Sequence, residues 1–316
     1  MAETYSLSFH TIGEHNYAGA ELETGYTLQK SITIVSIPIC ILGLFGNAII
    51  FCLLCCSVRK TNFTVYFLNL VLADFVVLIY YVIVFVFFLK AVPISLYTLH
   101  LMDLAHAFGF NAKTYVLTAI AAERYVMIFF PAWYRLRRPA HFSEIVSVIF
   151  WGLSGLLAIT LHYTCNLEID TSLQEANQHC EPTKMARVII NLLIFLPIMV
   201  FSTYLIFTRM LPASQEAPLR RLDITIVATV LLFLLFAASV RIIEIIARWV
   251  PKIHIPILFL SLHFLDAIDS SGNPYVYLIV GYSKTKLDCR NSFETLLERA
   301  LTLAMTSKRG VRLVKQ

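Results

Sequence analysis

The chain has 316 residues, of which 58% are hydrophobic and only 14% are charged, and its mean hydropathy is +0.74. Soluble domains usually carry about a quarter charged residues, so this composition excludes an ordinary soluble domain and indicates a membrane protein. The formal net charge of +5 comes without an interleaved basic and aromatic patch. It therefore argues against nucleic-acid binding and favours contact with anionic membrane lipids.

Seven apolar runs follow one another along the chain, each long enough to cross a bilayer at about 20 residues per crossing. Because backbone polar groups in lipid need internal partners, we expect helices; the strands of a β-barrel would be about half as long and alternating in polarity. The predicted fold is an all-α bundle of seven transmembrane helices. Their expected spans are Ile32–Cys56, Phe63–Leu89, Leu99–Phe130, Glu144–Cys165, Ala186–Met210, Leu222–Arg248 and His254–Tyr282.

The placement of Lys and Arg predicts the orientation of the bundle. With the N-terminus outside, the inner loops and tail hold sixteen Lys and Arg residues against six on the outer side, and the cytoplasmic side is normally the richer one. We expect an extracellular segment at 1–31, which lacks the pattern of a cleaved signal peptide. The helical bundle follows at 32–282, and an amphipathic helix with a cytoplasmic tail occupies 283–316.

The segment "KTKLDCRNSFETLLERAL" after the seventh span is expected to form a short amphipathic eighth helix at the membrane surface. Cys289 in this segment is a candidate for palmitoylation, and an unmodified buried cysteine is the alternative. The apolar stripe of the segment consists of Leu287, Phe293, Leu297 and Leu301.

The third span carries charges inside an apolar run. At 100° per residue, His106 and Lys113 lie within about 20° of Arg124, and Asp103 and Phe110 flank the same face. Ionisable residues in a crossing usually face the interior of the bundle and mark function. We therefore expect this face to run from a polar outer mouth, through Lys113, to Arg124 at the inner boundary.

Three other spans also carry polar faces. The second span has one charge, Asp74, and the sixth has Arg241, Glu244 and Arg248 near its outer end. In the seventh span, polar residues spaced by three, four and four form one stripe, with His263 one turn further outward. Polar faces that converge on the axis of a bundle can hold an outer ligand cavity above an internal polar network. The stripe of the seventh span consists of Asp266, Asp269, Asn273 and Tyr277.

Six short motifs, in order on the seven spans, resemble those of class A (rhodopsin-like) G-protein-coupled receptors. Each motif alone is weakly specific, but six in order are strongly specific, and the resemblance covers roughly residues 30 to 300. The motifs are "GNAII" with Asn47, "NLVLADF" with Asp74, "ERY" from Glu123 to Tyr125, Trp151, Pro197, and "NPYVY" from Asn273 to Tyr277.

Within this class the chain resembles the Mas-related receptors, which carry the patterns FGxN, LTAIxxER and PxWYRxxRP in this order. The corresponding stretches are "FGFN", "LTAIAAERY" and "FPAWYRLRRPAH". Two absences agree with this resemblance: Leu99 replaces the usual Cys at the outer end of the third helix, and Ala237 replaces the usual sixth-helix Trp. Ser239 is a departure even within the subfamily, since many Mas-related receptors keep a Pro there.

The resemblance implies a plasma-membrane receptor with an extracellular N-terminus, which binds a small molecule or peptide and activates a heterotrimeric G protein. It implies no cofactor. It also suggests a disulfide between Cys165 and Cys180, with two free thiols as the alternative. An ion pair between Glu123 and Arg124 would hold the resting state, and a snorkelling interfacial Arg is the alternative. The implied activation residues are Glu123, Arg124, Tyr125, Asn273, Pro274 and Tyr277.

Lys113 is a departure from the class, because class A receptors usually have a small or hydroxyl residue there, which helps Asp74 bind sodium. We hypothesise that the Lys113 ammonium replaces the sodium ion and pairs with Asp74, Asp269 or both. An unpaired charge at this depth costs several kcal/mol, and a neutral lysine is the alternative. The expected internal network consists of Asn47, Asp74, Lys113, Asp269 and Asn273.

Seven residues near the outer end are candidate ligand contacts, with helix-to-helix hydrogen bonding as the alternative. His106 stands where amine receptors carry Asp, which argues against monoamines. Leu161 and Thr183 stand near the places where some Mas-related receptors use acids to bind cationic peptides, so that mode is not supported here. The mixed charges suit a zwitterion or a short peptide. The candidates are Asp103, His106, Phe110, Arg241, Glu244, His263 and Asp266.

Two other classes of function stay open at this point. A membrane transporter or channel could use Lys113, Asp74 and Asp269 as a charge relay, although the chain lacks the paired halves with broken helices that transporters often show. A receptor-like protein that does not signal is the other, given Ala237 and Ser239. We expect neither an enzyme nor a metal site, because no nucleophile and base form a recognisable set and the Cys and His spacings fit no zinc pattern.

Overall fold

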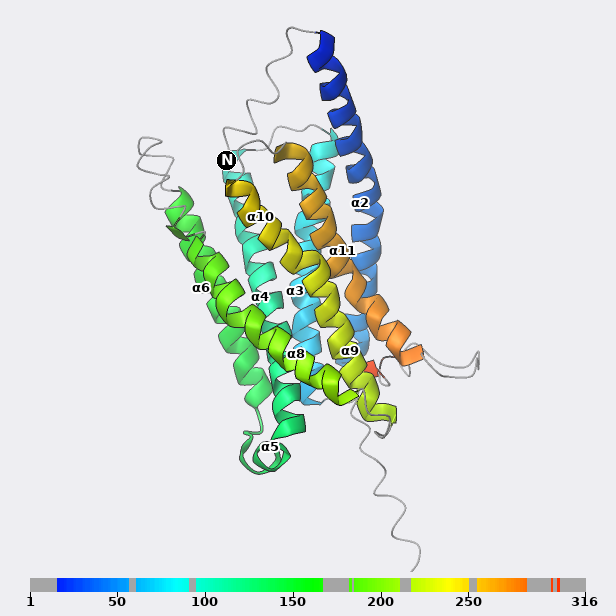
Figure 1. Cartoon of the computed structure of the whole chain (residues 1–316), viewed down its shortest axis with the longest axis vertical. Coiled ribbons are helices and arrows are strands. Elements are labelled where there is room, and N and C mark those ends of the chain that lie inside the picture. Colours follow the sequence, from blue (N-terminus) through cyan, green and yellow to red (C-terminus); the bar gives the residue numbers. More distant parts are fainter. Residues whose placement is uncertain are drawn as a thin grey trace, which may run out of the picture.

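In the computed structural model every described element is helical (Figure 1), which agrees with the predicted all-α fold. The structure describes residues 16–56, 61–90, 95–166, 182–183, 185–210, 217–249 and 255–282, together with residues 297, 300 and 301. The elements are α2 (Asn16–Cys56), α3 (Asn62–Lys90), α4 (Leu96–Phe129), α5 (Pro131–Arg137), α6 (Phe142–Asn166), η2 (Asn191–Phe195), α8 (Leu196–Met210), α9 (Ala217–Phe233), η3 (Leu234–Ala238), α10 (Ser239–Trp249) and α11 (Ile255–Tyr282).

The long helices run side by side along the vertical axis of Figure 1, and the short helix α5 lies across one end. We call this the α5 end. The bend between α4 and α5 is 108°. At the opposite end, α2 begins at Asn16 rather than at the expected Ile32, because a helix satisfies its own backbone and does not have to stop where its side chains become polar.

Two of the expected spans are composite helices that contain a π-helical turn. One helix continues from Met185 through η2 and α8 to Met210, and the other consists of α9, η3 and α10. A π-turn inserts an extra residue and reorients the side chains beyond it. At the end of η3, the hydroxyl of Ser239 donates to the backbone oxygen of Phe236 at 3.0 Å. Ser239, which stands where many Mas-related receptors keep a Pro, thus directly follows η3, and η3 supplies an irregularity in this helix without a proline.

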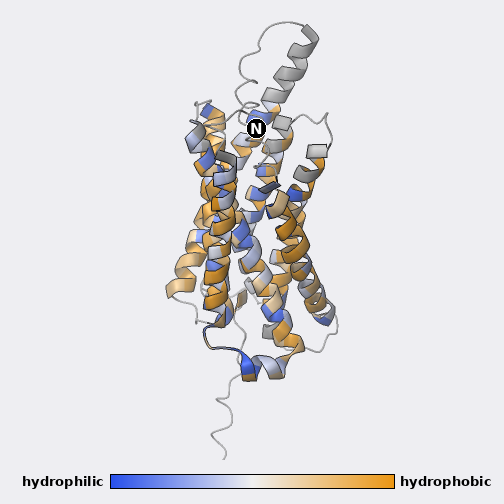
Figure 2. Ribbon diagram, turned by 90° about the vertical axis from the view of Figure 1, so that its left-hand side faces the viewer, coloured by the Kyte–Doolittle hydropathy of each residue, from blue (hydrophilic) through white to orange (hydrophobic). Residues whose placement is uncertain are grey.

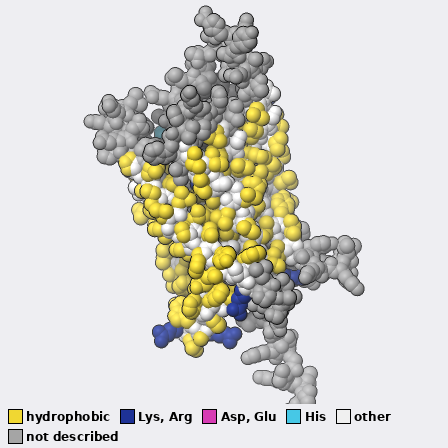
Figure 3. All heavy atoms as spheres, in the orientation of Figure 1, with side chains coloured by type: hydrophobic (Ala, Val, Ile, Leu, Met, Phe, Trp, Pro, Cys, Tyr) yellow, Lys and Arg dark blue, Asp and Glu magenta, His cyan; other side chains and the backbone are white. Residues whose placement is uncertain are grey.

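The outer surface of the bundle fits a bilayer. Within the described residues, five helical segments are long and apolar enough to cross a membrane, and α4 joins them if it is counted together with α5. Helix α11 has 28 residues but is not among them, because its polar stripe lowers its hydropathy. Figure 2 shows hydrophobic residues along the length of the helices. On the face in Figure 3 they cover the middle, and the visible Lys and Arg side chains gather at the α5 end.

Helix α4 lies at the centre of the packing and contacts α3, α6, α8, η2 and α9, while α11 packs against α2, α3 and α9. The main apolar cluster lies among these helices, and Leu297, Ala300 and Leu301 are buried in it. Thr225 Oγ1 on α9 donates to the backbone oxygen of Ala300 at 3.0 Å. These members of the expected eighth helix are therefore buried against the bundle. Cys289 and the rest of its apolar stripe lie outside the described residues.

Helices α2 and α11 approach closely at Gly43. A Cβ atom at this position would lie 2.3 Å from Ser271 Oγ and 2.9 Å from its backbone Cα. Only a residue without a side chain therefore permits this contact. It keeps α2 against the part of α11 that carries the polar stripe.

We expect Gly43→Ala to lower the free energy of unfolding by about 1–3 kcal/mol, because overpacking a tight contact costs this much. The measurement is the thermal unfolding midpoint of the purified protein in detergent. Gly152→Ala on α6 is the matched control, since a Cβ there would meet nothing within 4 Å. Equal midpoints for the two variants would contradict the close approach at Gly43.

Candidate functional site

A buried ion cluster lies in the middle of the bundle. The Lys113 Nζ atom on α4 is 2.7 Å from Asp74 Oδ1 on α3 and 2.5 Å from Asp269 Oδ2 on α11. It also donates to Ser270 Oγ at 3.1 Å. The three charged side chains are at most 2% exposed. The ammonium thus lies against both carboxylates that were hypothesised as its partners, and it joins three helices.

Two amide side chains extend this cluster. Asn273 Nδ2 donates to Asp74 Oδ2 at 2.7 Å. Asn47 Nδ2 on α2 donates to the backbone oxygens of Gly43 at 2.9 Å and Ser270 at 3.2 Å. All five residues of the expected network are therefore buried together. A single ammonium therefore lies between two carboxylates at the centre of this network.

A second polar cluster lies nearer the end opposite α5. The Tyr81 hydroxyl donates to Asp266 Oδ2 at 2.8 Å and lies 3.0 Å from His106 Nε2. An Arg241 guanidinium nitrogen lies 2.5 Å from the same Asp266 oxygen. These contacts connect α3, α4, α10 and α11. The alternative expected for the ligand candidates, hydrogen bonding between helices, is thus present for His106, Arg241 and Asp266, and the same holds for His263.

The remaining polar candidates for ligand contact are His263, Asp103 and Glu244. His263 Nε2 lies 3.2 Å from the Tyr80 hydroxyl and is buried. Asp103 is exposed. Glu244 belongs to α10, but its side chain lies outside the described part of the chain. Sequence patterns had no signal for Tyr80 or Tyr81, because a tyrosine in an apolar helix does not disturb the hydrophobic pattern.

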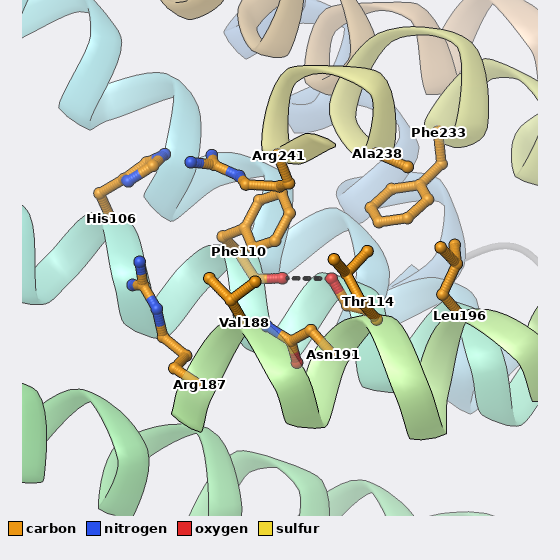
Figure 4. Close-up of a pocket in the computed structure, with 11 residues that line it drawn as sticks. His106, Phe110, Thr114, Arg187, Val188, Asn191, Leu196, Phe233, Ala238 and Arg241 are labelled. Carbon is orange, nitrogen blue, oxygen red and sulfur yellow. Dashed lines mark hydrogen bonds between the residues drawn. The ribbon is translucent and has the colours of Figure 1, made fainter. Parts of the chain in front are cut away.

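A cavity opens between α4, the Met185–Met210 helix, and the composite helix of α9, η3 and α10 (Figure 4). Asn191 on η2 and Ala238 on η3 contribute to its wall, so both π-turns border it. The Arg241 guanidinium lies 4.2 Å from the Phe110 ring centroid. The lining residues are His106, Phe110, Thr114, Arg187, Val188, Asn191, Leu192, Leu196, Phe233, Ala238 and Arg241.

Arg124 and Glu123, at the α5 end, have separate ionic partners. Arg124 Nε lies 2.5 Å from Asp223 Oδ1 on α9, whereas Glu123 Oε1 lies 2.8 Å from a guanidinium nitrogen of Arg138. The side chains in both pairs are at most 8% exposed. These pairs replace the expected pairing of the two neighbours with each other. The physical reason is that adjacent residues on a helix do not face each other.

Glu123 connects α5 and the segment that leads into α6 to the rest of the bundle. It accepts hydrogen bonds at 2.7 Å from the hydroxyls of both Tyr66 and Tyr134, in addition to its pairing with Arg138. Burial, reinforced by the bond to Glu123, raises the pKa of Tyr134 to about 12, so this phenol remains a donor at neutral pH. Two side chains of the stretch "PAWYRLRRP", Tyr134 and Arg138, thus contact Glu123 and give this stretch a structural role.

The other activation candidates pack against neighbouring side chains. The Tyr125 ring packs 4.9 Å from the Phe129 ring, and the buried Tyr277 ring meets Phe67 edge-on at 5.4 Å. A Cβ on Gly46 would lie 3.2 Å from Pro274, which is also buried. The expected disulfide stays a prediction, since the Cys165 side chain and all of Cys180 lie outside the described residues.

The model of the rhodopsin family of 7 transmembrane receptors matches residues 46–277. The chain is 30% identical to the proto-oncogene Mas of Rattus norvegicus over 300 residues, covering 92% of this chain and 89% of that protein. It is 31% identical to the Mas-related G-protein coupled receptor member X1 of Homo sapiens over 292 residues, covering 90% and 87%. Human member X3 is 32% identical over 295 residues, with 90% and 87% covered.

The chain belongs to the Mas-related G-protein-coupled receptors. Such a receptor is a seven-transmembrane signalling protein and not an enzyme, so the predicted family, fold class and receptor function are confirmed. The transporter, channel and non-signalling alternatives are not favoured by these relatives. In this receptor, the buried charges form an internal polar network that lies between the cavity and the α5 end.

In this Mas-related receptor, we expect Lys113→Met to be strongly destabilising, because it leaves two buried carboxylates without their cation. Removing one partner of a buried ion pair typically costs about 3–5 kcal/mol. Adding Asp269→Asn should recover part of the loss, since one of the stranded charges disappears. Thermal midpoints of the purified receptor measure both effects.

Arg135→Met is the control for this pair of variants, because it removes an exposed cation on α5 and should leave the midpoint unchanged. If Lys113→Met were as stable as the unmodified receptor, the ion cluster would not contribute to folding.

Proposed function

We propose that the receptor lies in the plasma membrane with its N-terminus outside, binds its ligand in the cavity, and activates a heterotrimeric G protein at the α5 end. The observation that carries this proposal is the buried pair between Arg124 on α4 and Asp223 on α9. This pair links α9, in the sixth expected span, to α4, the third span, at the end of the bundle away from the cavity. The excess of Lys and Arg on the expected cytoplasmic side supports the orientation.

The sixth helix connects the two ends physically. Phe233, Ala238 and Arg241 line the cavity, and Asp223 lies further along the same composite helix. Between Arg241 and Asp223 lies η3, a π-turn at which a helix deforms more easily than in a regular α-helical stretch. A ligand that favours a different position of the cavity wall therefore shifts the population towards a state in which the α9 end has moved away. In that state Arg124 separates from Asp223 and becomes accessible to the G protein.

Helix α5 offers the receptor's second surface for the G protein. Its Leu136 side chain is 85% exposed and Trp133 is 49% exposed, while Arg135 and Arg137 are exposed beside them. Because Tyr134 and Arg138 hold Glu123, this surface is fixed to the α4 segment that carries Arg124. An apolar residue surrounded by cations suits a partner surface with an apolar pocket and acidic rim.

We expect Asp223→Asn to raise ligand-independent G-protein activation several-fold, because it removes the charge that holds Arg124. Arg124→Ala should reduce activation to background, even when combined with Asp223→Asn. Nucleotide exchange on purified G protein, at equal receptor amounts, measures both. Glu144→Gln, which removes an exposed carboxylate at the same end, is the control. Unchanged basal activation in Asp223→Asn would refute the proposed restraint.

We further propose that the Lys113 ammonium takes the place of a mobile sodium ion between Asp74 and Asp269. The contacts of 2.7 Å and 2.5 Å support this role, since one cation already satisfies both carboxylates. The bound charge is then permanent, and the receptor does not respond to the sodium concentration.

Lys113→Ser removes this built-in cation and leaves a hydroxyl beside the two carboxylates. We expect ligand affinity in this variant to depend on sodium, with potassium as the ionic-strength control. Radioligand or reporter titrations at matched ionic strength provide the measurement. Sodium sensitivity in the unmodified receptor would be incompatible with the proposed replacement.

A further inference from the structure

The two ends of the cavity differ in chemistry. His106, Arg187 and Arg241 lie on the parts of their helices that are further from the α5 end, and Figure 4 shows their nitrogen-bearing tips on one side of the cavity. Phe233 and Leu196 lie at the other side, nearer the middle of the bundle. The cavity therefore combines a cationic mouth with an apolar floor.

None of the eleven described residues that line the cavity is acidic. This lining differs from the mixed charges that the sequence had suggested. Asp103 is exposed and does not line the cavity, and Asp266 faces Tyr81 and the outer side of Arg241. Asp266 therefore positions the Arg241 guanidinium without belonging to the described lining.

Two of these three side chains, Arg241 and His106, are held in position before any ligand arrives. Asp266 and the Phe110 ring fix the Arg241 guanidinium, and the Tyr81 hydroxyl fixes the His106 ring. A site that is already ordered loses less entropy on binding. Guanidinium groups also match the planar geometry of a carboxylate and form charge-assisted hydrogen bonds with it.

The apolar floor depends on small side chains in the sixth helix. Ala238 lines the cavity, and Ala237 beside it is buried in the main apolar cluster. Since both carry only a methyl group, the floor remains open towards Phe233 and Leu196. A flat or elongated apolar group fits this space, whereas a second charge there would lose its hydration without compensation.

We propose that the cavity recognises an organic acid with an apolar body. Its carboxylate lies between Arg187 and Arg241 beside His106, and its apolar body lies against Phe233, Leu196 and Ala238. This inference rests on the proposed receptor function and specifies the ligand class of the same cavity. The apolar C-terminal residue of a peptide presents the same two features, so the test includes both sources.

The test uses the purified full-length receptor in lipid nanodiscs and follows its thermal midpoint as a function of probe concentration. The probes are 4-phenylbutyrate, 4-phenylbutan-1-ol and 4-phenylbutylamine, which share one apolar body and differ in the charge of the head. We expect the acid to stabilise the receptor at least about tenfold more potently than the alcohol, because a charge-assisted contact contributes roughly this factor. The amine should be weaker still.

Variants assign the contacts. Arg187→Gln should weaken binding of the acid by about tenfold and leave binding of the alcohol unchanged. Arg241→Gln should act in the same direction, and Ala238→Phe should weaken the acid and the alcohol alike by filling the floor. Lys90→Gln, which removes an exposed cation at the end of α3 that does not line the cavity, is the control. Tighter binding of the amine than the acid, or an unchanged acid affinity in both Arg187→Gln and Arg241→Gln, would overturn the proposal.

A peptide arm compares Ala-Ala-Phe with its C-terminal amide. Selective binding of the free carboxylate at a lower concentration than 4-phenylbutyrate assigns the site to a peptide C-terminus, and the reverse order assigns it to a small acid. The binding measurement needs no G protein. If the acid binds with the expected variant pattern but does not alter nucleotide exchange, the ligand class stands and the proposed coupling fails.

Discussion

Burying the Lys113 ammonium in the middle of the membrane is possible only if carboxylates from other helices come to meet it. Asp74 and Asp269 do so from α3 and α11, and this requirement sets how those helices are rotated about their axes. Gly43 and Asn47 then bring α2 against the same part of α11. The cluster divides the interior into a region that opens towards the cavity and a region that ends at α5.

At the α5 end, two adjacent charged residues have different tasks. Glu123 organises a fixed structure, because it accepts hydrogen bonds from Tyr66 and Tyr134 and pairs with Arg138. Arg124 makes its ion pair across to Asp223, on a different helix. Since neighbouring side chains point about 100° apart on a helix, Glu123 meets α3 and α5 while Arg124 meets α9.

The periodic polar faces predicted the middle of the molecule well. Lys113 and Asp269 interrupt apolar runs, and helical periodicity places each of them on a polar face. Their meeting with Asp74 was anticipated from the resemblance to class A receptors, which puts Asp74 opposite Lys113. The partner of Arg124 could not be anticipated, because Asp223 lies near the end of a span where charges are common and the relative height of two helices is not a local property. Arg187 was missed for a related reason: it was counted as one of the basic residues of the outer side. The π-turns have no sequence signature comparable to a proline, and they decide which residues of the fifth and sixth helices face the cavity.

The π-turn η3 has a consequence for how this receptor can diversify. Deleting one residue from the turn would restore a regular helix and rotate everything beyond it by about 100°. Such a change would turn α10, and with it Arg241, while α9 kept its orientation and Asp223 its position opposite Arg124. The composite helix of α9, η3 and α10 is therefore modular: a single-residue length change can redirect α10 to a new chemical environment without altering the half that carries Asp223.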